Sequence, residues 1–116
     1  MEAASEAGAK KAAKALPSND LKPFLKNDPV GQALEAGSTR TKKQNGGAQV
    51  YEVRDKLELP GGAQLKKGDQ YHLDTLHRDH LEVYNKRNNF TQAINLDGSV
   101  NVAKTQAGLK EGRTLD

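Results

Sequence analysis

The three histidines of this 116-residue chain all fall within nine residues, and carboxylates are interleaved with them. The six groups of this segment are His72, Asp74, His77, Asp79, His80 and Glu82. A carboxylate beside a histidine stabilises the imidazolium and raises the histidine pKa, whereas burial or a nearby cation lowers it. Neighbouring side chains here can therefore hold opposite protonation states near neutral pH, as general acid–base catalysis requires.

Two strand-like runs, residues 69–74 and 80–85, frame this segment. Side chains alternate between the two faces of a strand. The apolar side of both runs consists of Tyr71, Leu73, Leu81 and Val83. If that side faces the core, the opposite face collects His72, Asp74, His80, Glu82 and Tyr84. We therefore expect one hairpin to hold a cluster of imidazoles and carboxylates, with His77 and Asp79 in its loop.

Two other interpretations of the cluster remain open. The polar face of an antiparallel sheet is normally solvated, so these residues could be ordinary exposed side chains. Alternatively, His77-x-x-His80 could bind a metal ion with a further ligand from Asp74, Asp79 or Glu82. No histidine follows His80, so the His-Asn-His nuclease pattern is absent.

The elements around the hairpin follow from periodicity and turn residues. A strand-like run begins at residue 48 and is closed by Pro60-Gly61-Gly62, and another covers residues 90–96. Asp97-Gly98 predicts a hairpin turn into a strand over residues 99–102. A last helix is expected over residues 103–111, ending at Gly112. The nearby cations, any of which could be a solvated helix-end charge or an anion clamp, are Lys104, Lys110 and Arg113.

The N-terminal part is predicted to be helical. Residues 2–16 are rich in alanine and would form a marginal helix ending before Pro17. Shorter helices are expected at residues 21–26 and 30–36, with their apolar residues docking on the main domain, followed by a basic, glycine-rich loop over residues 37–47. The sequence therefore predicts an α+β fold, in which short N-terminal helices precede an antiparallel sheet of four or five strands.

Composition limits the classes of function. Without cysteine, the chain has no disulfide, thiolate nucleophile or cysteine-ligated metal. No apolar run reaches the roughly 20 residues that cross a bilayer, so we expect no membrane segment. The net charge of +3 comes from residues 1–46, which carry eight basic and five acidic residues, whereas residues 47–116 carry ten of each. The basic excess therefore lies outside the half that contains the cluster.

Several motifs resemble the cytotoxic ribonuclease domain of the ribosome-cleaving colicins. They are the segment KKQNGG at residues 42–47, Tyr71-x-x-Asp74-x-x-His77 and Leu81-Glu82-Val83-Tyr84. Related domains form the C-terminal parts of polymorphic toxins in contact-dependent inhibition, Rhs and pyocin systems. The resemblance covers residues 42–116 and is best at 71–97. It implies two parts, a helical arm and linker to a parent toxin at residues 1–46 and a catalytic domain with a twisted antiparallel sheet at residues 47–116.

The resemblance also implies catalytic residues. The family's aspartate, histidine, glutamate and arginine correspond to Asp74, His77, Glu82 and Arg113. This chain has one extra residue before the Leu-Glu pair and carries His80 there, so either His77 or His80 could hold the family role. Leu73 stands where the family has tryptophan. The neutral C-terminal half also differs from the strongly basic ribosome-cleaving members, whose affinity depends on phosphate contacts.

The implied activity is a metal-independent endoribonuclease that needs no cofactor. Glu82 or a histidine would take the proton from a ribose 2′-hydroxyl, and protonated His77 or His80 would assist the leaving oxygen, giving a 2′,3′-cyclic phosphate. Asp74 would orient a histidine, and Arg113 or a lysine would stabilise the phosphate. The expected substrate is ribosomal RNA at the decoding centre or transfer RNA. The expected RNA-binding residues are Lys42, Lys43, Lys66, Lys67, Tyr84, Lys86 and Arg87.

A toxin of this kind implies an inhibitory partner protein and a means of delivery into the target cell. We expect a monomer that is silenced by an acidic immunity protein, delivered from the producing cell as part of a larger bacterial toxin, and active in the cytoplasm of the target cell. The competing hypothesis is a non-catalytic binding or adaptor module that docks a partner on the polar face of the sheet. The neutral C-terminal half motivates it.

Overall fold

The computed structural model describes residues 15–115, so the expected helix at residues 2–16 lies almost entirely outside the described residues. The α+β prediction is confirmed. The helices are α2 (Lys22–Asn27), α3 (Pro29–Ala36) and α4 (Val102–Glu111). The strands are β1 (Ser38–Asn45), β2 (Ala48–Val53), β3 (Leu57–Glu58), β4 (Gln64–Leu65), β5 (Gln70–Leu73), β6 (His80–Tyr84) and β7 (Phe90–Asn95). None of the described helices combines the length and apolar character that a membrane crossing needs.

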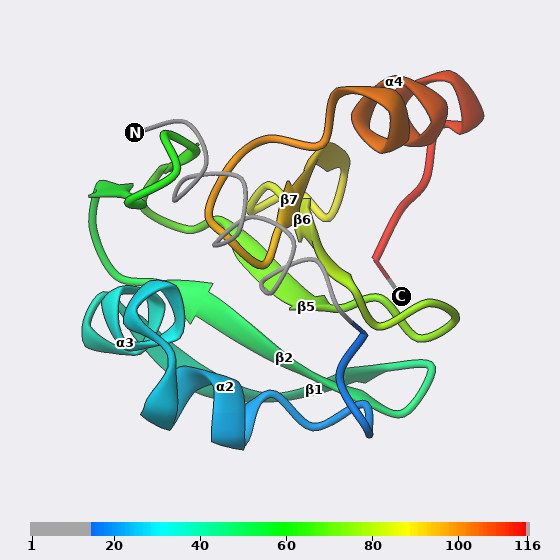
Figure 1. Cartoon of the computed structure of the whole chain (residues 1–116). Coiled ribbons are helices and arrows are strands. Elements are labelled where there is room, and N and C mark those ends of the chain that lie inside the picture. Colours follow the sequence, from blue (N-terminus) through cyan, green and yellow to red (C-terminus); the bar gives the residue numbers. More distant parts are fainter. Residues whose placement is uncertain (1–14, 116) are drawn as a thin grey trace, which may run out of the picture.

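One antiparallel sheet organises these elements. Its strand order is β1-β2-β5-β6-β7, and β3 pairs with β4 in a separate two-stranded ribbon. In the central hairpin, His72 lies opposite Glu82 and Leu73 lies opposite Leu81. Figure 1 shows α2 and α3 below the sheet and α4 above it. The two faces of the sheet are therefore covered by different helices.

The helices α2 and α3 cover the apolar face. Asp28 caps α3 by accepting a hydrogen bond from the backbone N–H of Val30 at 2.9 Å, and Pro29 occupies the first helical turn. The two helices approach so closely that a Cβ at Gly31 would lie 2.0 Å from the carbonyl oxygen of Phe24. The expected docking of the helical apolar residues is confirmed, because the main core cluster includes Leu21, Phe24, Leu25, Val30 and Leu34 beside the sheet residues.

The helix α4 covers the other face. The Asn101 side chain caps it, and Gly112 ends it in the left-handed conformation with φ of 66°. A Cβ at Gly108 would lie 2.4 Å from a ring carbon of Phe90, so only glycine allows this approach. A second, smaller core lies on this side and contains Val50, Tyr84, Phe90, Ala93 and Leu115.

Two local predictions are wrong. Residues 38–45 of the expected loop form β1, which pairs with β2, so the proposed division at residue 46 falls in the turn between two paired strands. Polar residues are compatible with β1 because it is a largely exposed edge strand. Its sequence therefore resembles that of a loop, and only its pairing with β2 identifies it as a strand. The strand expected at residues 99–102 is reduced to one bridge between Ile94 and Val100, because α4 begins at Val102.

Candidate active site

The β5–β6 hairpin brings the predicted polar residues together, as alternation along the strands requires. His72 and Glu82 are directly paired, and the backbone N–H of Asp74 donates to the carbonyl of His80 at 3.0 Å. The exposed fractions are 2% for His72, 9% for Asp74, 2% for His80 and 6% for Glu82. The interpretation as ordinary solvated side chains is therefore wrong. This face is closed by the segment that follows β7, which contains α4 and Arg113.

His80 lies at the centre of the cluster. Its Nδ1 contacts Oδ1 of Asp79 at 2.7 Å, while its Nε2 lies 3.8 Å from Oδ1 of Asp74 and 3.9 Å from Oε2 of Glu82. Burial lowers the pKa of His80, but the carboxylates of Glu82, Asp79 and Asp74 outweigh it, so the pKa is raised above the usual value. The two contacts of Nε2 are longer than a normal hydrogen bond. The Nε2 proton is therefore held in an anionic environment without being tightly bound.

Glu82 is the anionic partner of this imidazole. Its Oε2 accepts a hydrogen bond from Arg113 at 2.6 Å, and its Oε1 accepts one from the Tyr84 hydroxyl at 2.9 Å. Burial raises the pKa of Glu82, but His80, Tyr84, His72 and Arg113 favour the charged form more strongly and lower the pKa to about 2. Glu82 is therefore ionised at neutral pH. Arg113, which the resemblance matches to the family's arginine, donates directly to it.

His77 lies at the edge of the cluster. Its side chain is about half exposed, and its Nδ1 lies 3.4 Å from Oδ2 of Asp74, which also accepts the His77 backbone N–H. The next residue, Arg78, has a left-handed backbone with φ of 56°. The carbonyl of Arg78 accepts a hydrogen bond from the backbone N–H of Leu16 at 2.8 Å. The β5–β6 loop therefore turns at Arg78 and is hydrogen-bonded to the segment before α2.

His72 has a different environment from the other two histidines. Its Nδ1 donates to the carbonyl oxygen of Leu73 at 2.8 Å, and its Nε2 accepts from the Asn45 amide at 2.9 Å. Its ring stacks on that of Tyr84, with centroids 5.6 Å apart. His72 is thus buried beside the site, and both of its ring nitrogens form hydrogen bonds within the protein.

A cleft of about 130 Å³ opens over the cluster. It is lined by the five predicted catalytic residues, Asp74, His77, His80, Glu82 and Arg113, together with Leu76, Lys104 and Ala107. The sequence placed Lys104 only among three cations that could be anion clamps. Its position in the first turn of α4 puts it at the cleft, and no pattern in the sequence predicts where α4 packs. The cleft therefore contains two cationic side chains, Arg113 and Lys104.

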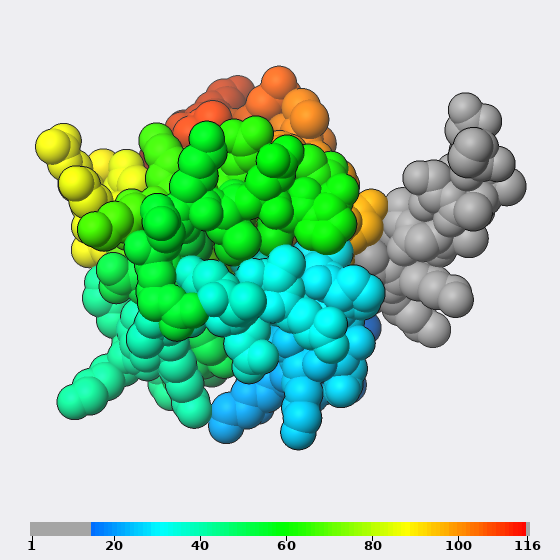
Figure 2. Space-filling view, turned by 90° about the vertical axis from the view of Figure 1, so that its left-hand side faces the viewer, coloured from blue at the N-terminus to red at the C-terminus, as the bar shows by residue number. Residues whose placement is uncertain are grey.

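The predicted RNA-binding residues separate into two groups. Around a hollow of about 320 Å³ lie Lys66, Lys67, Lys86 and Arg87. Lys42 and Lys43 lie in β1, and Lys43 Nζ donates to Gln70 Oε1 at 2.7 Å. Figure 2 shows β1 in aquamarine and the β6–β7 turn in yellow projecting from the same side of the molecule. These residues can form one basic surface.

Tyr84 does not belong to that surface. It is 2% exposed, its hydroxyl is bonded to Glu82, and its ring is packed against His72 on one side and the ring of Phe90 at 5.7 Å. A base cannot stack on a ring that is enclosed in this way. The expectation that Tyr84 contacts RNA is therefore wrong, and its place in the site is to hold Glu82.

The metal interpretation can be tested against distances. Asp74, His80 and Glu82 each offer one ligand atom, and these atoms lie within 4.8 Å of one another. His80 Nε2 lies 3.8 Å from Oδ1 of Asp74 and 3.9 Å from Oε2 of Glu82, whereas tetrahedral ligands at about 2.1 Å from a zinc ion lie about 3.4 Å apart, so the group would have to contract. It would also have to release the Glu82 oxygen that Arg113 occupies. His77 is not one of the three, so the His77-x-x-His80 pair does not form the group.

Comparisons of the chain with protein-family models, with curated proteins and with solved structures give no match. The motifs of the chain and the geometry of the cleft are therefore the features that indicate its function.

Proposed function

We propose that this chain is the ribonuclease domain of an antibacterial toxin and that it cleaves RNA without a metal ion. The observation that carries the proposal is the arrangement at the cleft, where His80, Glu82 and Arg113 meet. These residues provide a proton donor, an ionised carboxylate and a phosphate-binding cation in one small space. The resemblance to the ribonuclease domain of the ribosome-cleaving colicins supports the same reaction.

His80 is the proton donor in this proposal. Its raised pKa keeps a larger fraction charged near neutral pH, and Asp79 fixes the ring through Nδ1. Its Nε2 faces the carboxylates at 3.8 and 3.9 Å and can give its proton to the leaving 5′-oxygen of the cleaved phosphodiester. Asp74 lies within reach of both His77 and His80 and orients them.

Glu82 is the proton acceptor for the ribose 2′-hydroxyl. A carboxylate with a pKa of about 2 is a weak base while Arg113 holds it. A substrate phosphate competes for the same guanidinium, and loss of that ion pair makes Glu82 more basic. Attack of the 2′-oxygen then forms the 2′,3′-cyclic phosphate, while Arg113 and Lys104 stabilise the charge on the phosphate. His77, at the mouth of the cleft, is the alternative acceptor.

The substrate in this proposal is ribosomal RNA at the decoding centre or transfer RNA. The RNA would bind along the basic surface formed by Lys42, Lys43, Lys66, Lys67, Lys86 and Arg87, because phosphate contacts dominate nucleic-acid affinity. The producing cell would silence the domain with an acidic immunity protein that covers the cleft or this surface. The toxin would be delivered from the producing cell and act in the cytoplasm of the target.

Expression in a bacterium without the immunity protein tests the function. The wild-type chain should stop growth and yield RNA fragments that map either to the small ribosomal subunit or to transfer RNA. Glu82→Gln and His80→Gln should remove both effects while the circular dichroism spectrum is kept. Lys56→Ala, which removes an exposed charge elsewhere, should stay toxic. Growth arrest that persists in the Glu82 and His80 variants would contradict the proposal.

A non-catalytic binding module is the second candidate. It is favoured by the mutual pairing of Glu82 and Arg113, because an ion pair between a buried carboxylate and a partly exposed arginine can also serve a purely structural role. A docking module predicts that the wild-type chain leaves growth and RNA unchanged. The expression experiment therefore separates the two functions.

A further inference from the structure

A larger cavity lies on the opposite side of the sheet from the candidate site. It has a volume of about 560 Å³, is open to solvent on one side and is lined by residues of α2, α3, β1 and β2 and by Arg54. Tyr51 forms part of its lining and stacks on Tyr71, whose side chain belongs to the main core, at a centroid distance of 5.6 Å. Tyr71 and His72 are neighbours on β5 and point to opposite faces. The cavity and the catalytic cleft are therefore separate.

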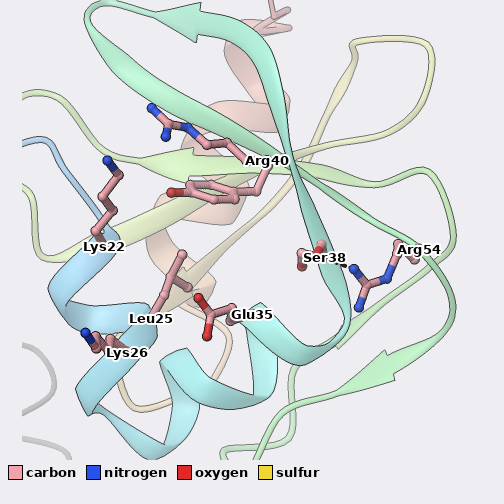
Figure 3. Close-up of a pocket in the computed structure, with 8 residues that line it drawn as sticks. Lys22, Leu25, Lys26, Glu35, Ser38, Arg40 and Arg54 are labelled. Atoms are coloured by element: carbon pink, nitrogen blue, oxygen red, sulfur yellow. Dashed lines mark hydrogen bonds between the residues drawn. The ribbon is translucent and has the colours of Figure 1, made fainter.

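The cavity has a strongly positive lining. Lys22 and Lys26 lie one turn apart on α2, and Arg40 projects from β1 toward the same opening in Figure 3. Arg54 is a fourth cation, and Glu35 is the one carboxylate among residues 15–115 that lines the space. Among residues 15–115, Lys22, Lys26 and Arg40 form no ion pair. Like charges that share a hollow repel one another, and a bound anion would relieve that repulsion.

Two side chains of the cavity are fixed in place. Arg54 donates to the carbonyl oxygen of Ser38 at 2.8 Å and to that of Ala36, which anchors its guanidinium group beside the end of α3. Tyr51 is 6% exposed as a residue, but its hydroxyl oxygen is not buried; it forms no hydrogen bond to another described residue and is accessible from the cavity. The Tyr51 hydroxyl is therefore available to donate a hydrogen bond to a ligand in the cavity.

We propose that this cavity binds a phosphate-bearing ligand of nucleotide size. Its volume lies within the range of about 300–1,000 Å³ that is typical of small-molecule sites. Lys22 and Arg40, whose side-chain ends lie near each other in Figure 3, would hold the phosphate through charge-assisted hydrogen bonds, and the Tyr51 hydroxyl would donate to a phosphate or ribose oxygen. The ligand can be a free nucleotide or a nucleotide unit of a nucleic-acid strand. This inference does not depend on the ribonuclease proposal.

Titration calorimetry on the full chain tests the inference. The probes are adenosine 5′-monophosphate and a single-stranded 12-residue oligodeoxynucleotide, which cannot be cleaved because it lacks the 2′-hydroxyl. Binding of at least one probe should weaken about 10-fold in Arg40→Ala, as expected for loss of a charged hydrogen bond. It should weaken about 5-fold in Tyr51→Phe, which keeps the stacked ring. Lys56→Ala, a matched loss of one exposed charge, should bind as the wild type does.

The two probes identify the source of the phosphate. Binding of the mononucleotide that depends on Tyr51 and Arg40 assigns the cavity to a free nucleotide, whereas the same dependence for the oligonucleotide alone assigns it to a strand. The inference fails if neither probe shows that dependence, or if Lys56→Ala weakens binding as much as Arg40→Ala. It also fails if an oligoglutamate peptide binds more tightly than either probe, because the cavity would then fit an acidic protein. Absence of RNA cleavage would leave all of these results unaffected.

Discussion

The two faces of the sheet differ in whether their charged side chains are paired with one another. On the α4 face, the buried groups Glu82 and His80 are paired with the partly exposed side chains of Arg113 and Asp79. On the α2–α3 face, Lys22, Lys26 and Arg40 surround an open cavity and form no ion pairs among the described residues. Buried groups in contact shift one another's pKa values, whereas unpaired surface cations attract an external anion. The first arrangement suits proton transfer, and the second suits binding.

The largest expected effect is on catalysis at His80. His80→Gln retains a planar polar side chain but cannot donate a proton as an imidazolium does. RNA cleavage should fall about 10³-fold, because a general acid contributes about 10²- to 10⁴-fold. The same variant should keep adenosine 5′-monophosphate binding at the opposite face, which calorimetry measures. Cleavage within a few-fold of wild type would contradict the role of His80.

Arg113 should have the next largest effect. Arg113→Lys keeps the charge but loses the fork that reaches Glu82 Oε2 at 2.6 Å. We expect kcat to fall about 10²-fold, as for removal of one donor that stabilises transition-state charge. Steady-state cleavage of a short RNA measures this, with Lys110→Ala, at the exposed end of α4, as the control. A change in KM alone would reduce Arg113 to a binding residue.

The pH dependence of cleavage distinguishes the two candidate proton acceptors. If Glu82 is the acceptor, kcat/KM has no ascending limb between pH 5 and 8 and falls only as His80 loses its proton above its raised pKa. If His77 is the acceptor, its imidazole must lose a proton before cleavage, so kcat/KM has an additional ascending limb that His77→Ala removes. Profiles of the wild type and His77→Ala therefore assign the acceptor.

Stability should also depend on pH through the same two groups. The pKa of Glu82 is lowered from 4.5 to about 2 in the folded state, so its stabilising contribution is complete above pH 4.5 and is lost as pH falls toward 2. The pKa of His80 is raised from 6.5, so its contribution is complete below pH 6.5 and is lost as pH rises through the folded-state value.

These two groups together favour a maximum in the free energy of unfolding between pH 4.5 and 6.5. The Glu82 contribution is at most on the order of 3 kcal/mol. Urea unfolding of the wild type and Glu82→Gln at several pH values measures it. An acid limb that is equally steep in both proteins would assign the loss of stability to other carboxylates.

The smallest expected effect concerns the basic surface. Lys86 and Arg87 lie beside the hollow they share with Lys66 and Lys67. Replacing both with alanine should reduce the slope of log affinity against log salt by about 0.7 per lost phosphate contact for single-stranded RNA. Mononucleotide binding at the opposite face should be unchanged. An unaltered salt slope would remove these two residues from the RNA path.

The hairpin was the most predictable part of the molecule. Alternation along residues 69–74 and 80–85 predicts that His72 and Glu82 share a face, and this holds because a strand has a period of two. The end of α4 at Gly112 and the cap of α3 by Asp28 also follow from local residue chemistry. Each of these features depends on neighbours within a few residues.

Features that depend on distant packing could not be predicted in the same way. The segment that forms β1 is polar because it is an edge strand, so its sequence is typical of a loop. Burial of His80 and Glu82 depends on where α4 docks, and that docking requires the absence of a side chain at Gly108 against Phe90. The cavity lined by Lys26 and Arg40 combines two elements whose approach has no local signal.

The most direct test of the central claim is the chemistry of the RNA ends that the purified chain produces in excess EDTA. The acid–base arrangement of His80 and Glu82 predicts cleavage in chelator, fragments ending in 2′,3′-cyclic phosphate with free 5′-hydroxyls, and loss of this activity in Glu82→Gln. Cleavage that requires added magnesium, or fragments that carry 5′-phosphates, would contradict the claim and favour the metal interpretation of Asp74, His80 and Glu82.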